Sequence, residues 1–304
     1  MGEQTVVGVV GVGLLGSAVS GVLLEAGYPI VGHDVVAEKV QALVARGGRG
    51  ARSAAEVARS ARIVFTILPT LESVEQAIAG ADGVLSGASK ETVIVQMSTI
   101  SPELAVRMEQ TARGRGAALL DAPVSGTSAM VARRDCVITV GGERAAFETC
   151  RPVLEALARK VFHVGACGMG SYVKLVTNLV MGLNGVVLAE GLTLARRAGV
   201  DPSQMLEVLR HGAAASKILE VRGPLMVDGR FDAMMKVDLF LKDIRLMLEA
   251  AQALHVPLPL TGAMQQLYTA AFAAGQAKDD LASIVRVYEA MAGLPPRGGA
   301  TGAA

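Results

Sequence analysis

The sequence predicts an α/β protein in two parts, a doubly wound parallel sheet and then an all-α region that a long helix joins to it. Short apolar, β-branched runs alternate with helical segments as far as Val164, which is the pattern of repeated β-α-β units. Strand signals then stop, and helical periodicity continues to about Gly293. We therefore expect a sheet domain at residues 1–164, a helical domain at residues 165–294 and a flexible Gly/Ala/Pro-rich tail at residues 295–304.

The chain begins with a strand, a glycine turn and a helix. Residues 5–10 are apolar and largely β-branched, as in a strand buried on both faces, and helical spacing runs over residues 17–26. Between them, three glycines in a GxGxxG pattern allow a tight turn, a close approach of backbone to a pyrophosphate and close helix packing, as in a Rossmann-type fold. The helix N-terminus also attracts phosphate. We expect a dinucleotide to bind this turn, at Gly11, Gly13, Leu14, Leu15 and Gly16.

Asp34 points to the kind of dinucleotide. It follows a second short strand at residues 29–33 and lies 18 positions after Gly16 (34 − 16 = 18). A carboxylate at this strand end hydrogen-bonds the adenosine ribose hydroxyls and repels a 2′-phosphate. No arginine comes directly after it. The sequence therefore predicts NAD in preference to NADP, and a role of Asp34 as a helix N-cap is compatible with this.

The next elements continue the alternation. Ser101 and Pro102 form an N-cap and first-turn pair that starts one of the helices. Because ligands bind beyond the carboxyl ends of the strands in such sheets, the loops of interest are residues 11–16, 68–69, 98–99 and 121–127. We expect strands at residues 63–68, 92–97, 117–120, 136–140 and 161–164, with helices at residues 53–60, 71–79 and 143–158.

A long helix at residues 169–197, ended by Gly199, opens the second part. It is apolar on nearly all faces and contains three glycines, each of which costs ~1 kcal/mol in a helix and is usually offset by close packing. We expect a second subunit to cover part of it, with burial by the chain's own helices as the alternative. Its apolar stretch is too short and too interrupted by asparagines for a membrane span. Further helices are expected from Asp201-Pro202 and at residues 237–254, 260–274 and 280–292.

Composition narrows the function. A net charge of +1 and an aromatic content of 3% argue against nucleic-acid binding. The three cysteines and four histidines have no metal-ligand spacing, so no metal site is expected. The odd cysteine count suits a reducing compartment, and no signal peptide is read at the N-terminus. We therefore expect a cytoplasmic protein without a membrane partner.

Lys174 stands at the head of the long apolar helix with almost no charged neighbours. Such a lysine either snorkels to the surface or uses its charge. The stretches Gly168-Met-Gly-Ser-Tyr-Val-Lys174-Leu-Val-Thr-Asn178, Asp121-Ala-Pro-Val-Ser-Gly126 and Phe240-Leu-Lys242-Asp243, together with the glycine turn, resemble the motifs of the β-hydroxyacid dehydrogenases, which include 3-hydroxyisobutyrate dehydrogenase and tartronate semialdehyde reductase. The resemblance covers nearly the whole chain.

The resemblance implies an NAD-dependent oxidoreductase that interconverts a short 3-hydroxyacid and its semialdehyde or oxo acid. Lys174 would be the general acid/base, and Asn178, one turn later on the same helix face, would hold the substrate. Asp243 would orient this region, unless it forms only a helix salt bridge. The implied substrate residues are Ser125, Gly126, Thr127 and Asn178. The implied cofactor residues beyond the turn are Asp34, Leu68, Pro69, Thr99 and Lys242.

The chain departs from the family pattern at Thr127, where a second glycine is usual. Threonine disfavours positive φ and adds a hydroxyl, so it argues for a polar substrate or a smaller pocket. Three alternatives remain: a cofactor-bound scaffold without activity, a 6-phosphogluconate-type enzyme, and a reductase of a phosphorylated or sulfonated acid that Arg133 and Arg134 would meet. We expect a homodimer or homotetramer that associates through the helical domain.

Overall fold

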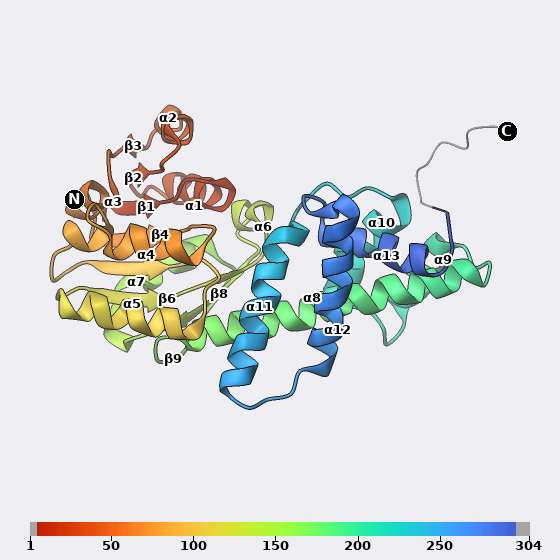
Figure 1. Ribbon diagram of the computed structural model, residues 1–304. Helices are drawn as coiled ribbons and strands as arrows, with labels where there is room; N and C mark the ends of the chain where they lie inside the picture. Colours follow the sequence, from red (N-terminus) through yellow and green to blue (C-terminus); the bar gives the residue numbers. More distant parts are fainter. Residues whose placement is uncertain (1–4, 296–304) are drawn as a thin grey trace. The chain divides into compact units, whose positions relative to one another are not determined.

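The structure is a computed structural model that describes residues 5–295. The chain forms two compact units, one that ends at Lys174 and one that begins at Leu175 (Figure 1). The first contains the sheet and the second contains helices only, as expected. The expected tail lies outside the described residues except for Pro295.

The first unit is built on a sheet in which β1 lies between β2 and β4, so the strand order reverses at β1. The order is β3-β2-β1-β4-β5-β6-β8-β7, and β9 pairs with β8. The strands are β1 (Val7–Val10), β2 (Ile30–His33), β3 (Arg49–Gly50), β4 (Ile63–Thr66), β5 (Val93–Gln96), β6 (Ala118–Asp121), β7 (Val124–Ser125), β8 (Val137–Gly141) and β9 (Lys160–Gly165).

The sheet is parallel from β3 to β6, but β8 runs antiparallel to β6 and β7. The expected doubly wound sheet is therefore mostly parallel, with antiparallel pairing at this edge. A parallel return needs a crossover of a dozen or more residues, usually with a helix that packs across the sheet. Between β6 and β8 the chain forms only the two-residue β7 and the short α6 (Ser128–Ala132), so it returns antiparallel.

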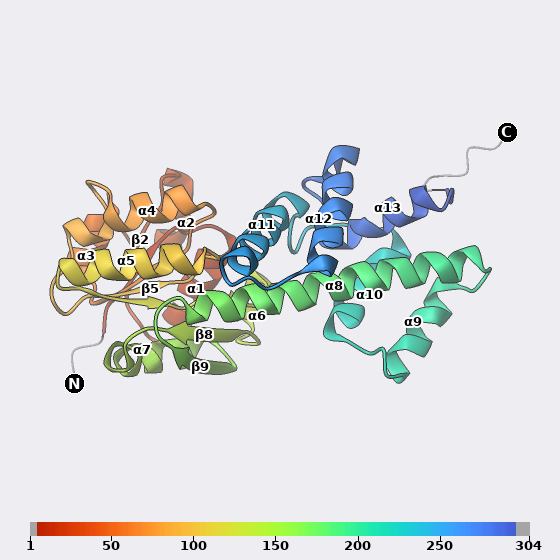
Figure 2. The same ribbon diagram turned by 60° about the horizontal axis from the view of Figure 1, so that its bottom comes forward.

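Helices cover both faces of the sheet, and side-chain alternation along the strands explains this. In β5, Val93 and Val95 join the core under α1 (Leu14–Glu25) and α7 (Arg144–Leu157), while Ile94 joins the opposite core. That opposite core contains α3 (Ala54–Ser60), α4 (Leu71–Ala79), α5 (Pro102–Gly114) and the 3₁₀ turn η1 (Val84–Ser86). Figure 2 shows α4 and α5 side by side.

The second unit consists of the larger part of α8 (Met169–Arg197) and the helices that follow it. The start and end of α8 and the positive φ of Gly199 agree with the sequence prediction. Asp201 caps the next helix by accepting a hydrogen bond from the backbone N–H of Gln204, as expected. The other helices are α9 (Pro202–His211), α10 (Lys217–Asp228), α11 (Val237–Ala253), α12 (Pro259–Ala271), the π-turn η2 (Phe272–Gln276), η3 (Leu281–Ser283) and α13 (Ile284–Met291).

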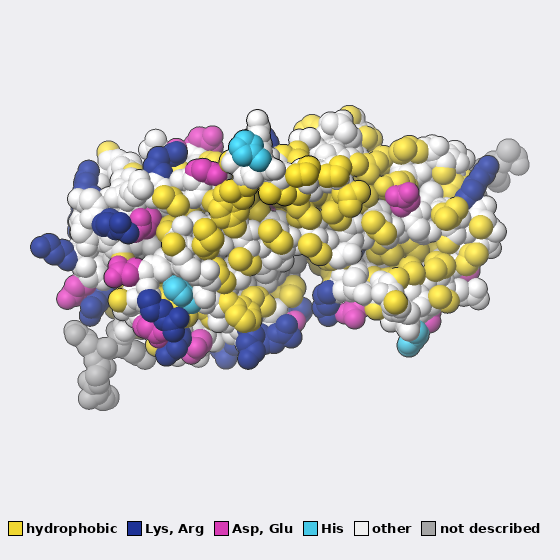
Figure 3. Space-filling view, turned by 90° about the horizontal axis from the view of Figure 1, so that it is seen from below, with side chains coloured by type: hydrophobic (Ala, Val, Ile, Leu, Met, Phe, Trp, Pro, Cys, Tyr) yellow, Lys and Arg dark blue, Asp and Glu magenta, His cyan; other side chains and the backbone are white. Residues whose placement is uncertain are grey.

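The chain's own helices bury only one side of α8. Leu175, Val186 and Leu192 are buried, and Gly182 packs against α11 and α12. The opposite side carries an exposed apolar stripe with positions four and seven residues apart, formed by Val176, Val180, Val187 and Leu194. Apolar side chains cover much of the face in Figure 3. The expectation that the apolar stretch is too short for a membrane span is wrong for α8 as a whole, which is long and apolar enough to cross one. The core helix of a globular protein passes the same test.

Candidate active site

The glycine turn after β1 has the geometry that a dinucleotide needs. Gly11 has a φ of +93°, and a Cβ there would lie 2.1 Å from the carbonyl oxygen of Ile67. A Cβ at Gly16 would lie 2.0 Å from the carbonyl oxygen of Gly11, so this glycine lets α1 pack on the turn itself.

Gly13 is different, because a Cβ there would meet nothing within 4 Å. It is the N-cap of α1 and no side chain caps this helix end. The turn thus leaves open space at a helix N-terminus whose N–H groups suit a phosphate. Leu14 is exposed beside it and Leu15 packs into the core. The residues present therefore fit a dinucleotide.

Asp34 is tied to the same turn. Its Oδ2 accepts a hydrogen bond of 2.9 Å from the backbone N–H of Val12, and its Oδ1 accepts one of 2.9 Å from Val36. The N-cap of α2 (Ala37–Ala45) is Val36, so Asp34 does not cap this helix. The ammonium of Lys39 lies 3.3 Å from Oδ1. Lys39 lies in α2, five positions after Asp34, so the absence of an arginine directly after Asp34 does not reveal this cation in the sequence.

The loops after β4 and β5 are joined by one serine. Ser98 Oγ accepts a hydrogen bond of 2.8 Å from the backbone N–H of Leu68. The Ser98 backbone is in turn held by Gln96, whose side chain accepts from its N–H at 2.6 Å and donates to its carbonyl at 2.9 Å. Leu68 and Pro69 are thereby fixed beside the loop that carries Thr99, at the carboxyl ends of neighbouring parallel strands.

The expected substrate loop leads from β7 into α6. Ser125 is half-buried in β7, and Gly126 has a φ of +152° with Cys136 so close that a Cβ would lie 2.9 Å from its Cβ. Thr127 has a φ of −84°, so the replacement of the family's second glycine strains nothing. Its hydroxyl oxygen caps α6 by accepting a hydrogen bond from Met130 N–H at 3.3 Å. The expected substrate loop leads into α6 and the glycine turn leads into α1. These two helices pack against each other.

Lys174 and Asn178 both belong to α8, four residues apart, which is the spacing of one helix face. Lys174 is half-buried at the end of the first unit. In the second unit, the buried Asn178 donates from Nδ2 to Asp243 Oδ2 at 2.8 Å. The Lys242 ammonium lies 3.0 Å from Asp243 Oδ1, as an ion pair without hydrogen-bond alignment. Asp243 therefore brings Asn178 and Lys242 together and does more than pair with its neighbour in the helix.

A contact that the sequence did not predict joins Asp121, at the carboxyl end of β6, to the first turn of α8. Asp121 Oδ2 accepts a hydrogen bond of 2.6 Å from the Ser171 N–H, and Oδ1 accepts one of 2.7 Å from the Ser171 hydroxyl. Both side chains are almost fully buried. Burial raises the pKa of Asp121 to about 6, against the lowering effect of the bonds from Ser171 and the Gly168 backbone.

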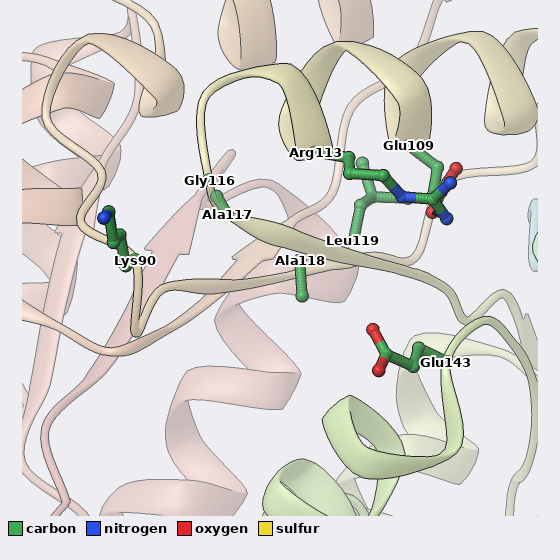
Figure 4. A pocket seen from close by; sticks show the side chains of 8 residues that line it. All are labelled: Lys90, Glu109, Arg113, Gly116, Ala117, Ala118, Leu119 and Glu143. Carbon is green, nitrogen blue, oxygen red and sulfur yellow. Dashed lines mark hydrogen bonds and ion pairs between the residues drawn. The ribbon is translucent and has the colours of Figure 1, made fainter.

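A separate pocket of the first unit lies at the start of β6 and not at its carboxyl end (Figure 4). Glu109 and Arg113 form an ion pair on one side of the strand, and Glu143 lies on the other. The side chains that line this pocket carry charges of both signs, so the pocket has no clear preference for an anion. Within residues 5–295, no group of three or more His, Cys, Asp or Glu side chains could hold a metal ion.

Comparison with known proteins extends these observations to the whole chain. The model of the NAD-binding domain of 6-phosphogluconate dehydrogenase matches residues 6–165, and the model of the NAD-binding part of NADP-dependent 3-hydroxyisobutyrate dehydrogenase matches residues 168–288. The chain is 34% identical to 2-(hydroxymethyl)glutarate dehydrogenase from Eubacterium barkeri, over 98% of this chain and 100% of that one. It is 32% identical to 2-hydroxy-3-oxopropionate reductase from Escherichia coli, over 94% of this chain and 97% of that one.

Among solved structures, a 3-hydroxyisobutyrate dehydrogenase from Salmonella typhimurium superimposes with a TM-score of 0.85 at 31% identity, over 93% of this chain and 100% of that one. Family models thus match both units of the chain, and the relatives match along nearly its full length. The chain therefore belongs to the β-hydroxyacid dehydrogenase family, that of 3-hydroxyisobutyrate dehydrogenase, whose oxidoreductases carry an NAD(P)-binding Rossmann domain.

Proposed function

We propose that this protein interconverts a short 3-hydroxyacid and its semialdehyde or oxo acid with NAD, and that Lys174 is the general acid/base. The observation that carries the proposal is the presence of two intact sets of residues in one chain. One is a glycine turn with open space at Gly13, and the other is Lys174 with Asn178 on one helix. A scaffold protein without activity would need neither an acid/base nor an oriented amide.

The proposed roles of the residues in substrate binding and proton transfer are as follows. Ser125 and Gly126 bind the substrate carboxylate through a hydroxyl and backbone N–H groups. Asn178 holds the substrate hydroxyl, since its amide nitrogen has a second hydrogen that the bond to Asp243 does not use. Lys174 takes the hydroxyl proton on Nζ during oxidation and returns it during reduction, a role of the kind that contributes ~10²–10⁴-fold. A bound nicotinamide supplies the acceptor or donor of the hydride.

For the cofactor, the position of Asp34 supports NAD. Its carboxylate lies at the end of β2 and bonds the glycine turn through Val12, where it would face an adenosine ribose. The nearby Lys39 weakens the repulsion of a 2′-phosphate, so we expect preference for NAD with residual use of NADP.

The substrates named for the relatives and the exposure of two arginines support the substrate class. The relatives named above act on 2-(hydroxymethyl)glutarate and 2-hydroxy-3-oxopropionate, and the Salmonella structure is of an enzyme of 3-hydroxyisobutyrate. All three are carboxylates with an alcohol or carbonyl nearby. Arg133 and Arg134 are exposed, which gives no support to a dedicated phosphate or sulfonate pocket. We therefore favour a plain hydroxyacid.

We also propose that a second copy of the chain covers the exposed stripe on α8. Val176, Val180, Val187 and Leu194 present apolar side chains at the four- and seven-residue spacing of a helix-packing face. Gly191 lies between the last two in sequence, and an added Cβ there would meet nothing within 4 Å, so a second helix could approach closely there.

The test is turnover of a panel of acids, 3-hydroxyisobutyrate, glycerate, threonate and 2-(hydroxymethyl)glutarate, with NAD and with NADP, read from the absorbance of the reduced cofactor. We expect Lys174→Ala to abolish turnover of any acid that the wild type oxidises while NAD binding, measured by calorimetry, persists. Retention of more than about a tenth of the activity would remove Lys174 from the acid/base role. Binding of NAD without turnover of any panel member would favour the scaffold alternative.

A further inference from the structure

The first turn of α8 is capped from a distant part of the chain. Helix N-termini leave backbone N–H groups that the helix itself does not satisfy, and a side chain just before the helix usually accepts them. Here the acceptor is Asp121, fifty residues earlier, which binds both the N–H and the hydroxyl of Ser171. One buried carboxylate therefore takes the place of an N-cap side chain.

The backbone around this contact is closely packed. A Cβ at Gly170 would lie 2.2 Å from the carbonyl oxygen of Asp121 and 2.9 Å from that of Thr139. A Cβ at Gly141 would lie 2.5 Å from the carbonyl oxygen of Ala166 and 2.9 Å from the Gly170 N. The start of α8 thus packs against the carboxyl ends of β6 and β8, and the hydrogen bonds from Ser171 to Asp121 hold it there.

We propose that Asp121 is a positioning residue for Lys174 and acts through Ser171. Ser171 and Lys174 are three residues apart on the same helix, so they share a face, and the seating of the first turn sets where the lysine side chain begins. The inference rests on the proposed role of Lys174 in proton transfer.

The cost of the arrangement supports a role beyond folding. Burying a carboxylate is unfavourable unless its bonds compensate, and burial raises the pKa of Asp121 to about 6 in spite of the lowering effect of the bonds from Ser171. A serine, threonine or asparagine could cap the helix with less burial of charge. What the carboxylate adds is a pair of short bonds, 2.6 Å and 2.7 Å, to two atoms of one residue, which fix that residue in position and direction.

The experiment compares Ser171→Ala and Asp121→Asn with Ser53→Ala, each in the full-length chain. Ser53 is the side-chain N-cap of α3 in the same unit, so its loss removes a helix cap that is remote from Lys174. Three quantities are measured: kcat and KM for the panel acid that the wild type oxidises fastest, NAD affinity, and the rate at which acetic anhydride labels Lys174 in the protein without substrate, read by mass spectrometry relative to Lys160.

We expect Ser171→Ala and Asp121→Asn to lower kcat by about tenfold or more, because misplacement of a reacting group by ~1 Å can cost ~10²-fold. KM and NAD affinity should stay within about threefold, since the interaction lost is one that serves the transition state. The labelling rate of Lys174 relative to Lys160 should change in both variants and not in Ser53→Ala, although all three lower the melting temperature.

Two results would overturn the proposal. One is an unchanged kcat in folded Ser171→Ala, the milder variant, which serves if Asp121→Asn does not fold. The other is a fall in kcat with an unchanged labelling rate of Lys174, because the effect would then not act through the lysine. Failure of the acid/base role itself is distinguishable, since Lys174→Ala would stay active while the labelling rate in Asp121→Asn still changed.

Discussion

Two glycines of α8 offer a sharp test of how this helix is packed. At Gly182 an added Cβ would lie 2.4 Å from Cζ of Phe240 and 2.7 Å from Sδ of Met264. Both neighbours are fully buried, and Tyr268 packs edge-on against the Phe240 ring at a centroid distance of 5.2 Å. At Gly191 an added Cβ would meet nothing within 4 Å. The same substitution therefore has opposite consequences at the two positions.

The magnitudes follow from two competing effects. Alanine is more favourable than glycine in a helix interior by ~1 kcal/mol. Forcing a methyl group into a packed core costs ~1–3 kcal/mol, and the Phe240 ring has little freedom to move. We expect Gly182→Ala to lower the free energy of unfolding by up to ~2 kcal/mol. We expect Gly191→Ala to raise it by up to ~1 kcal/mol at protein concentrations at which the chain is monomeric.

The assay is urea unfolding followed by circular dichroism at several protein concentrations, because association of two copies would make the midpoint concentration-dependent. A Gly182→Ala variant as stable as the wild type would refute the packing argument. A Gly191→Ala variant that is less stable, and more so at high protein concentration, would show that a second backbone approaches α8 at this glycine.

Two further predictions concern the cofactor and the assembly. Lys39→Ala should raise the ratio of kcat/KM with NAD to that with NADP by up to about fivefold, because an ion pair between an exposed lysine and a 2′-phosphate contributes up to ~1 kcal/mol. An unchanged ratio would show that Lys39, although it pairs with Asp34, does not act at the ribose. Val187→Asp should convert a dimer to a monomer in sedimentation velocity, whereas Val208→Asp should not, although both valines are 65% exposed. A monomeric wild type, or the same effect of both substitutions on the dimer, would exclude the α8 stripe as the contact.

The parts of the fold that the sequence predicted well are those with strong local signals. The bounds of α8 and α4 were predicted to the residue, and Ser101 with Pro102 begins α5 as expected. Elements that are short lack such signals, so β3, β7 and α6 were not predicted. The nine-residue α2 was not predicted either.

Helix α10 was missed for a different reason. It contains Gly223 and Pro224, which in sequence mark a break. The structure shows why the glycine is retained, since a Cβ there would lie 2.7 Å from Leu206 of α9. Tertiary packing therefore outweighs the local preference of these two residues, and a pattern confined to neighbours in sequence does not contain that information.

In the candidate site, too, the parts with local sequence signals were predictable and those that depend on long-range contacts were not. The conformation of the glycine turn was predictable because the binding of a dinucleotide, proposed for this turn, depends on backbone conformation, which Gly11, Gly13 and Gly16 indicate by their spacing. The proposed catalytic helix depends on contacts that span the chain, since Ser171 is held by a carboxylate 50 residues away and Asn178 by one 65 residues away.

These two carboxylates act on α8 from different units, Asp121 in the first and Asp243 in the second. Each is almost fully buried and each binds a polar side chain of the stretch that includes Lys174. A buried carboxylate left without its partner is costly, so neither of these side chains is expected to adopt another orientation. Ser171 and Asn178 are thus each held by a buried carboxylate of their own unit, whereas the loop at residues 125–127 has a threonine without backbone strain. Differences in substrate among relatives are therefore expected to arise in that loop and not on the helix.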